Sequence, residues 1–166
     1  MSLGIKSNSR KFLTLSILVA AIYAVLTVVL SPISYLAAFQ IRIADALIPL
    51  SYNKKVGKAA VYGTALGAFV ANIYSFYGVY DMLIGTVANF VASYAAYSLS
   101  KFKGFAPKVL ASLASFLIIV FLIGVVLFHL VLQIPIEVSL FGISIGSFIS
   151  IVVLGTLLLL GLEKVY

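Results

Sequence analysis

The stretch from Ala38 to Leu50, AFQIRIADALIPL, places polar and charged side chains among apolar ones. Gln40, Arg42 and Asp45 together offer hydrogen-bond donors, acceptors and both signs of charge. A charged side chain at membrane depth is costly unless it is paired or reaches water, and it marks a functional site by default. Arg42 and Asp45 are three residues apart, so on a helix they would share a face, where the arginine could orient the aspartate. The stretch therefore predicts either a polar binding site or a structural ion pair.

Other polar residues interrupt the next two apolar runs. Asn72 lies near the end of one run, and Asp81 and Asn89 lie eight residues apart in the following one, on one helical face. Amide, carboxylate and guanidinium groups beside aromatic rings suit a small, planar, polar solute. We predict that one cavity is lined by Gln40, Arg42, Asp45, Asn72, Asp81, Tyr35, Phe39 and Tyr77.

Each of these residues also has a purely structural interpretation. Asn72 and Asn89 could only hydrogen-bond neighbouring helices. Asp81 could complement a helix dipole near an N-terminus. The tyrosines of residues 74–80 could form an aromatic belt at a membrane surface.

The sequence carries no signature of an enzyme. It lacks the G-x-x-x-x-G-K-[ST] loop that binds nucleotide phosphates. His129 is the single histidine and cysteine is absent, which argues against a catalytic triad and against a metal centre. We therefore expect no catalytic activity, no cofactor and no metal, and any uphill transport would draw energy from an ion gradient or from another subunit.

The composition indicates an integral membrane protein. Apolar residues make up 64% of the chain, charged residues only 9%, and the mean hydropathy is +1.25. Soluble domains are about half apolar and about a quarter charged. We expect one domain, residues 1–166, which is an all-α bundle of six transmembrane helices. The predicted spans are Phe12–Leu30, Ile41–Tyr52 (from Tyr35 at the earliest), Lys58–Tyr74, Tyr80–Leu99, Lys108–Leu132 and Ile136–Leu162.

The basic residues predict the orientation of this bundle. The net charge is +7, but the lysines form short clusters beside apolar runs, which favours control of topology over binding of nucleic acid. With both termini in the cytoplasm, every lysine and arginine except Arg42 falls on the cytoplasmic side. Three of the four acidic residues, Asp45, Asp81 and Glu137, fall toward the opposite side.

Small residues recur every four positions in the first span, at Ser16, Ala20 and Ala24. Such a stripe allows another helix to approach closely. The approaching helix could belong to this chain or to a partner protein.

The residues of the second to fourth spans resemble the QueT-type family, which comprises substrate-binding (S) components proposed to import queuosine precursors. FQIRIADALIPL resembles the family pattern Gln-x-Arg-x-[Ser/Ala]-[Glu/Asp]-Ala-Leu. GTALGAFVAN resembles its third-helix Gly-x-x-x-Gly segment ending in Ala-Asn, and DMLIGTVAN resembles its Asp-x-x-x-Gly-[Ser/Thr] segment. The stripe of Ser16, Ala20 and Ala24 resembles the alanine motif by which S components dock on their transmembrane partner.

This resemblance implies the S component of an energy-coupling-factor (ECF) importer in the membrane of a prokaryotic cell. A transmembrane scaffold and two cytoplasmic ATPases would supply the work. The solute would be a queuosine precursor of the 7-deazaguanine type. Asp45 would accept hydrogen bonds from its N–H groups, and Gln40 and Asn72 would complete the polar edge. Asp81 would lie near a cationic aminomethyl group. The alternatives are another vitamin-like heterocycle, a stand-alone oligomeric carrier or channel that uses Arg42 and Asp45, or an accessory subunit without a ligand.

Overall fold

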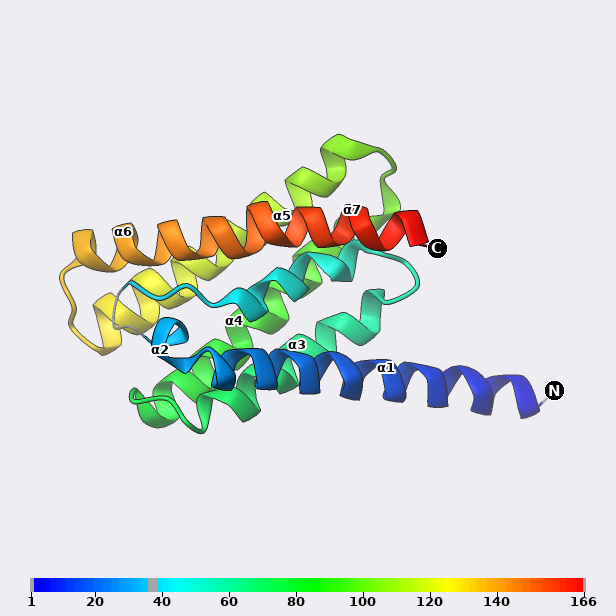
Figure 1. Cartoon of the computed structure of the whole chain (residues 1–166), viewed down its shortest axis with the longest axis horizontal. Coiled ribbons are helices and arrows are strands. Elements are labelled where there is room, and N and C mark those ends of the chain that lie inside the picture. The colour runs from blue at the N-terminus through cyan, green and yellow to red at the C-terminus, as the bar shows by residue number, and fades with distance from the viewer. Residues whose placement is uncertain (1, 36–38, 166) are drawn as a thin grey trace.

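The computed structural model describes residues 2–35 and 39–165, and in this part of the chain the secondary structure is helical, without a strand. In chain order the elements are α1 (Ser2–Val29), α2 (Ser31–Ser34), η1 (Ile43–Tyr52), α3 (Gly57–Asn72), α4 (Gly78–Ser98), η2 (Leu99–Lys101), α5 (Phe105–Ile119), η3 (Val120–Val131), α6 (Ile136–Ser147), η4 (Phe148–Gly155) and α7 (Thr156–Val165). The long helices form a bundle in which α4 and α5 are inclined to α1 and to the chain of α6 and α7 (Figure 1).

Four continuous helices of the described chain are long and apolar enough to cross a membrane. They are Asn8–Val29, Gly78–Lys101, Phe105–Val131 and Ile136–Lys164. The last two combine α-helix with π-helical segments, η3 in one and η4 in the other. The all-helical membrane architecture is confirmed, and the number of six spans stays a prediction because two of the predicted spans are short.

The second predicted span differs most from expectation. Residues 39–42 are not helical, and η1 is a 3-10 helix of 10 residues that contains Pro49. Proline lacks the N–H group that would continue an α-helical ladder. A 3-10 helix of this length rises about 20 Å, whereas the apolar core of a bilayer is about 30 Å thick.

The short helix η1 occupies the middle of the bundle. It contacts α1, α3, α4, α5, η4 and α7, and Figure 1 shows it between α1 and the chain of α6, η4 and α7. Its residues from Ala44 to Pro49 are buried. Any polar side chain on or next to η1 is therefore held within the protein.

Two glycines of α3 allow α1 to approach closely. A Cβ atom on Gly63 would lie 2.6 Å from the Cβ of Val19, and one on Gly67 would lie 2.6 Å from the Cβ of Tyr23. The Gly-x-x-x-Gly spacing thus serves contact between two helices of the same chain.

The small-residue stripe of α1 belongs to this contact. Ser16 and Ala20 are buried, with their carbonyl oxygens at 2.8 Å from the positions that Cβ atoms on Gly63 and Gly67 would take, and Ala24 is half-buried. This geometry favours internal packing for Ser16 and Ala20. Docking of a partner on the stripe stays a prediction.

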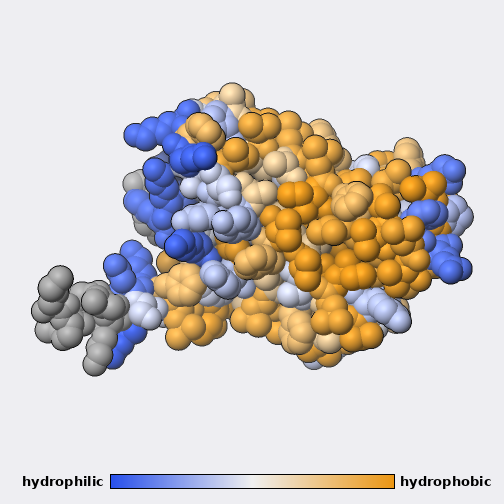
Figure 2. All heavy atoms as spheres, turned by 180° about the vertical axis from the view of Figure 1, so that it is seen from behind, coloured by the Kyte–Doolittle hydropathy of each residue, from blue (hydrophilic) through white to orange (hydrophobic). Residues whose placement is uncertain are grey.

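Charge is distributed unequally between the two ends of the bundle. The termini lie at one end, together with the loops of residues 53–56 and 102–104, while residues 39–42, 73–77 and 132–135 lie at the other (Figure 1). An apolar belt separates hydrophilic surfaces at the two ends (Figure 2). We call the first of these the basic end, because of the described residues it holds Arg10, Lys11, Lys54, Lys55, Lys58, Lys101, Lys103, Lys108 and Lys164.

We predict that Gly67→Ala destabilises the bundle, whereas Gly161→Ala does not. The methyl group on Gly67 would collide with the Tyr23 side chain and the Ala20 carbonyl, while a methyl group on Gly161 would have no neighbouring atom within 4 Å. Overpacking of this kind costs about 1–3 kcal/mol. Thermal unfolding in detergent, followed by circular dichroism, should show a lower midpoint for Gly67→Ala alone. Equal midpoints for the two variants would contradict the tight contact between α1 and α3.

Candidate functional site

A cluster of polar side chains lies inside the bundle, toward the end opposite the basic end. Its members come from residues 39–42, the start of η1, the end of α3 and the start of α4. All are at most 8% exposed, and they comprise Gln40, Arg42, Asp45, Asn72 and Asp81. The structure thus brings together all five polar residues of the predicted lining set.

Arg42 forms its ion pair with Asp81. Its Nη2 lies 3.7 Å from Asp81 Oδ2 and donates a hydrogen bond of 3.2 Å to Gln40 Oε1. The guanidinium carbon also lies 5.5 Å from the centre of the Tyr35 ring, which allows a cation–π contact. The ion pair of Arg42 in the described chain is thus with Asp81, whereas the sequence had offered Asp45 as one possible partner. Arg42 precedes η1 with φ −91° and ψ 87°, so the spacing rule for a continuous helix does not apply to it.

Asp45 is held by a residue that the sequence did not single out. The hydroxyl of Tyr23, which is fully buried on α1, donates a hydrogen bond of 2.5 Å to Asp45 Oδ1. Tyr23 and Thr27 are four residues apart within an otherwise apolar run. A tyrosine hydroxyl at membrane depth needs a hydrogen-bond partner, and this requirement could have identified Tyr23 from the sequence as a candidate member of the site.

Asp81 joins the ends of α3 and α4. Asn72 Nδ2 donates to its carbonyl oxygen at 3.0 Å and to Oδ1 at 3.3 Å, and Ser75 Oγ donates to Oδ2 at 2.5 Å. Gly85 makes room for this arrangement, because a Cβ there would lie 2.4 Å from Asn72 Nδ2. These contacts place a carboxylate where it can neutralise Arg42.

Two buried polar atoms of the cluster have no hydrogen-bond partner within the described chain. They are the Nε donor of Arg42 and the Oδ1 acceptor of Asn72. Buried polar atoms are nearly always paired, and an unpaired one requires an explanation. A ligand with its own acceptor and donor would satisfy both.

A cavity of about 20 Å³ adjoins the cluster. It is lined by Gln40, Arg42, Asp45, Asn89, Ile119, Ile123, Ile143 and Ser147. Such a volume holds about one water molecule. Gly146 backs this wall closely, since a Cβ there would lie 1.9 Å from the Gln40 carbonyl oxygen. The contributions of η3, α6 and Asn89 were absent from the predicted set of lining residues.

The three predicted aromatic residues have different surroundings. Tyr35 belongs to the cluster, because its ring lies beside Arg42 and its hydroxyl donates to the Ala71 carbonyl at 2.7 Å. Tyr77 is half-buried, with its ring 5.1 Å from that of Phe128. Phe39 is 51% exposed and meets Phe141 edge-on. None of these three aromatic residues lines the small cavity, and Asn72 and Asp81 do not line it either.

We predict that Arg42 and Asp81 are strongly coupled in stability. Arg42→Gln or Asp81→Asn alone leaves the other charge buried without its partner, which costs about 3–5 kcal/mol. The double variant should cost less than the sum of the two single ones. Denaturant unfolding in mixed micelles measures this difference.

The pair of Lys108 and Glu163, whose side chains are 16% and 35% exposed, provides the control for this cycle because it is more accessible to solvent than the buried pair. Lys108→Gln and Glu163→Gln should show a coupling of at most about 1 kcal/mol, because solvent screens surface pairs. Additive effects of Arg42→Gln and Asp81→Asn would show that the buried pair does not hold the cluster together.

The chain was also compared with known protein families, curated proteins and solved structures. The family model for the QueT transporter matches residues 13–164. No curated protein and no solved structure matches the chain. Because the match covers nearly the whole chain, including all five residues of the polar cluster, the protein belongs to the QueT transporter family of membrane transporters.

Proposed function

We propose that the chain is the substrate-binding subunit of an ATP-driven ECF importer in a prokaryotic cell membrane. Its solute would be a small planar heterocycle, a queuosine precursor of the 7-deazaguanine type. The observation that carries the proposal is the buried polar cluster. Within it Arg42 pairs with Asp81, and Tyr23 donates a hydrogen bond to Asp45. The Nε donor of Arg42 and the Oδ1 acceptor of Asn72 still have no hydrogen-bond partner within the described chain. Membership of the QueT transporter family supports transport as the activity.

The polar edge of a deazaguanine offers groups that match this cluster. Its N–H and amino donors would bind Asp45, whose carboxylate has about four acceptor sites, so that Tyr23 can hold one oxygen while the solute uses others. Hydrogen bonds to an ionised carboxylate are about twice as strong as neutral ones. The ring carbonyl would accept from Arg42 Nε, and Asn72 Oδ1 would accept a further N–H group.

The remaining residues would orient the solute and balance its charge. Gln40 would complete the polar edge, and Asp81 would lie near a cationic aminomethyl substituent. The ring of Tyr35, which already lies beside Arg42, would cover one face of the base. Phe39 and Tyr77 lie farther out and would contact the solute only during entry.

Binding would require the cavity to widen. A volume of about 20 Å³ cannot hold a bicyclic base. The stretch of residues 39–42 is not helical and packs on Gly146 of α6, and Ile41 N–H donates a backbone hydrogen bond of 2.9 Å to the Ile33 carbonyl. We infer that this stretch moves away from α6 when the solute enters.

The energy for uptake would come from partner proteins. The sequence has no phosphate-binding loop, and the family resemblance implies a transmembrane scaffold and two cytoplasmic ATPases. The exposed face of α1, with Leu13, Ile17 and Leu18 each more than half exposed, is more accessible to a scaffold than the buried side chains of Ser16 and Ala20. The basic end would face the cytoplasm.

We predict that Asp45→Asn weakens binding of an aminomethyl-substituted 7-deazaguanine by at least about tenfold. The amide keeps the shape of the side chain but removes the charge that strengthens its hydrogen bonds. Isothermal titration calorimetry on the purified chain measures the affinity. Glu137→Gln is the matched control, because Glu137 is an exposed carboxylate at the same end of the bundle. Wild-type affinity in Asp45→Asn would remove Asp45 from the site.

A second prediction separates the importer from a stand-alone carrier. Liposomes that contain the chain together with an ECF scaffold and its ATPases should accumulate the heterocycle only when ATP is supplied on the ATPase side. Liposomes that contain the chain alone should bind the solute without accumulating it. Uptake by the chain alone would favour an oligomeric carrier that uses Arg42 and Asp45.

A further inference from the structure

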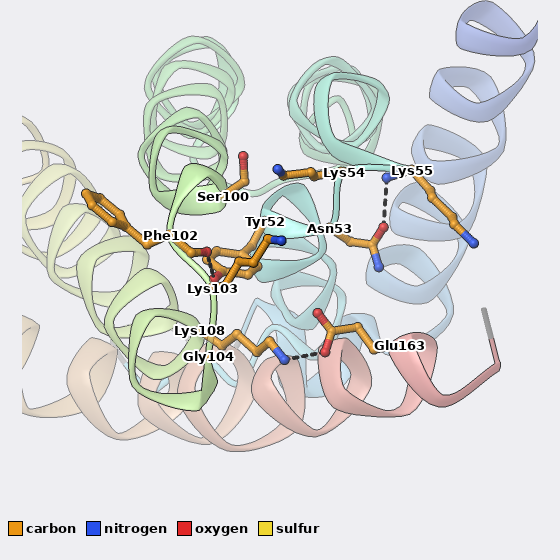
Figure 3. Close-up of a pocket in the computed structure, with 10 residues that line it drawn as sticks. All are labelled: Tyr52, Asn53, Lys54, Lys55, Ser100, Phe102, Lys103, Gly104, Lys108 and Glu163. Carbon is orange, nitrogen blue, oxygen red and sulfur yellow. Dashed lines mark hydrogen bonds and ion pairs between the residues drawn. The ribbon is translucent and has the colours of Figure 1, made fainter.

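A second and larger cavity lies at the basic end of the bundle. It has a volume of about 590 Å³ and is formed by the end of η1, the two loops that follow η1 and α4, the start of α5 and the end of α7. Figure 3 shows its lining residues: Tyr52, Asn53, Lys54, Lys55, Ser100, Phe102, Lys103, Gly104, Lys108 and Glu163. None of them belongs to the buried polar cluster.

Positive charge predominates in this cavity. Lys108 is paired with Glu163, the only acidic residue among the lining side chains. Lys54 and Lys103 form no ion pair within the described part of the chain. In Figure 3 the Lys103 side chain extends across Tyr52 toward Asn53, while the Lys55 side chain is directed away. Two ammonium groups thus remain to attract an anion.

The N-terminus of α5 adds to this potential. Gly104 precedes the helix with φ +119°, no side chain caps the helix, and its first turn has no acidic residue. The first N–H groups of a helix carry partial positive charge and favour an anion. Tyr52 and Asn53 supply further polar groups at the cavity wall, the tyrosine hydroxyl being fixed by a hydrogen bond of 2.5 Å to the Phe102 carbonyl.

Exposed aromatic rings indicate which anion is favoured. Phe102 and Phe105 are 51% and 63% exposed and lie on either side of Lys103 in the sequence, and Phe105 begins an apolar helix that is long enough to cross a membrane. Rings of this kind pack among acyl chains at the membrane boundary, whereas lysines beside them meet lipid phosphates. We propose that this cavity binds the phosphate-bearing headgroup of an anionic lipid. The site is independent of the solute and of the proposed transport mechanism.

Native mass spectrometry on the full chain in detergent tests the assignment, with phosphatidylglycerol, phosphatidylcholine and inorganic phosphate as probes. Phosphatidylglycerol should be retained in preference to the other two. The double variant Lys54→Gln/Lys103→Gln should weaken its retention by about tenfold or more, since each lysine near a membrane surface contributes a few-fold. Glu163→Gln should strengthen retention, because it frees Lys108 from its partner.

The matched control is Arg10→Gln/Lys164→Gln, which removes the same charge from the same end at residues that do not line the cavity. It should retain phosphatidylglycerol like the wild type. Equal losses in both double variants would overturn the proposal, because the general field of the basic end would then suffice. Retention of inorganic phosphate as strong as that of the lipid, or tighter binding of an acidic peptide, would overturn the lipid assignment.

Discussion

An arginine buried in an apolar bundle must be neutralised, and the arrangement of the second to fourth predicted spans follows from this constraint. Arg42 reaches Asp81 at the start of α4, and Asp81 is in turn held by Asn72 at the end of α3 and by Ser75 in the turn that follows. Removal of one partner of such a pair leaves the other charge buried and uncompensated, which destabilises the fold far more than replacing both partners with apolar residues. The ion pair therefore fixes how residues 39–42 lie against both helices.

Close backbone packing makes this burial geometrically feasible. Glycines at positions 63 and 67 bring α1 against α3, which places the Tyr23 hydroxyl within reach of Asp45. Gly146 lets the backbone at Gln40 lie against α6. Small residues in different helices thus allow the backbones to pack around the polar cluster. The hydrogen bonds of the cluster need partners from more than one of these helices. The same closeness leaves only a small cavity, so the solute binding that we propose would require a local separation of these elements.

The sequence was sufficient to predict an all-helical membrane protein and the residues of the polar cluster. Intramembrane charges are rare enough that Arg42, Asp45 and Asp81 could be selected without a structure. The pairing between them could not be predicted, because it depends on Arg42 lying in an extended stretch rather than on a helix. Tyr23 was missed because a tyrosine in an apolar run is compatible with lipid contact as well as with a buried hydrogen bond. The stripe of Ser16 and Ala20 has the same spacing whether it meets α3 or a partner, so only the fold could distinguish between these surfaces.

We propose that the buried polar cluster is the solute site. An experimental structure of the chain saturated with an aminomethyl-substituted 7-deazaguanine tests it most directly. We expect the base to lie within hydrogen-bond distance of Asp45 and Arg42, with residues 39–42 displaced from α6. A base bound elsewhere, with the contacts of Arg42 to Asp81 and of Tyr23 to Asp45 unchanged, would contradict it.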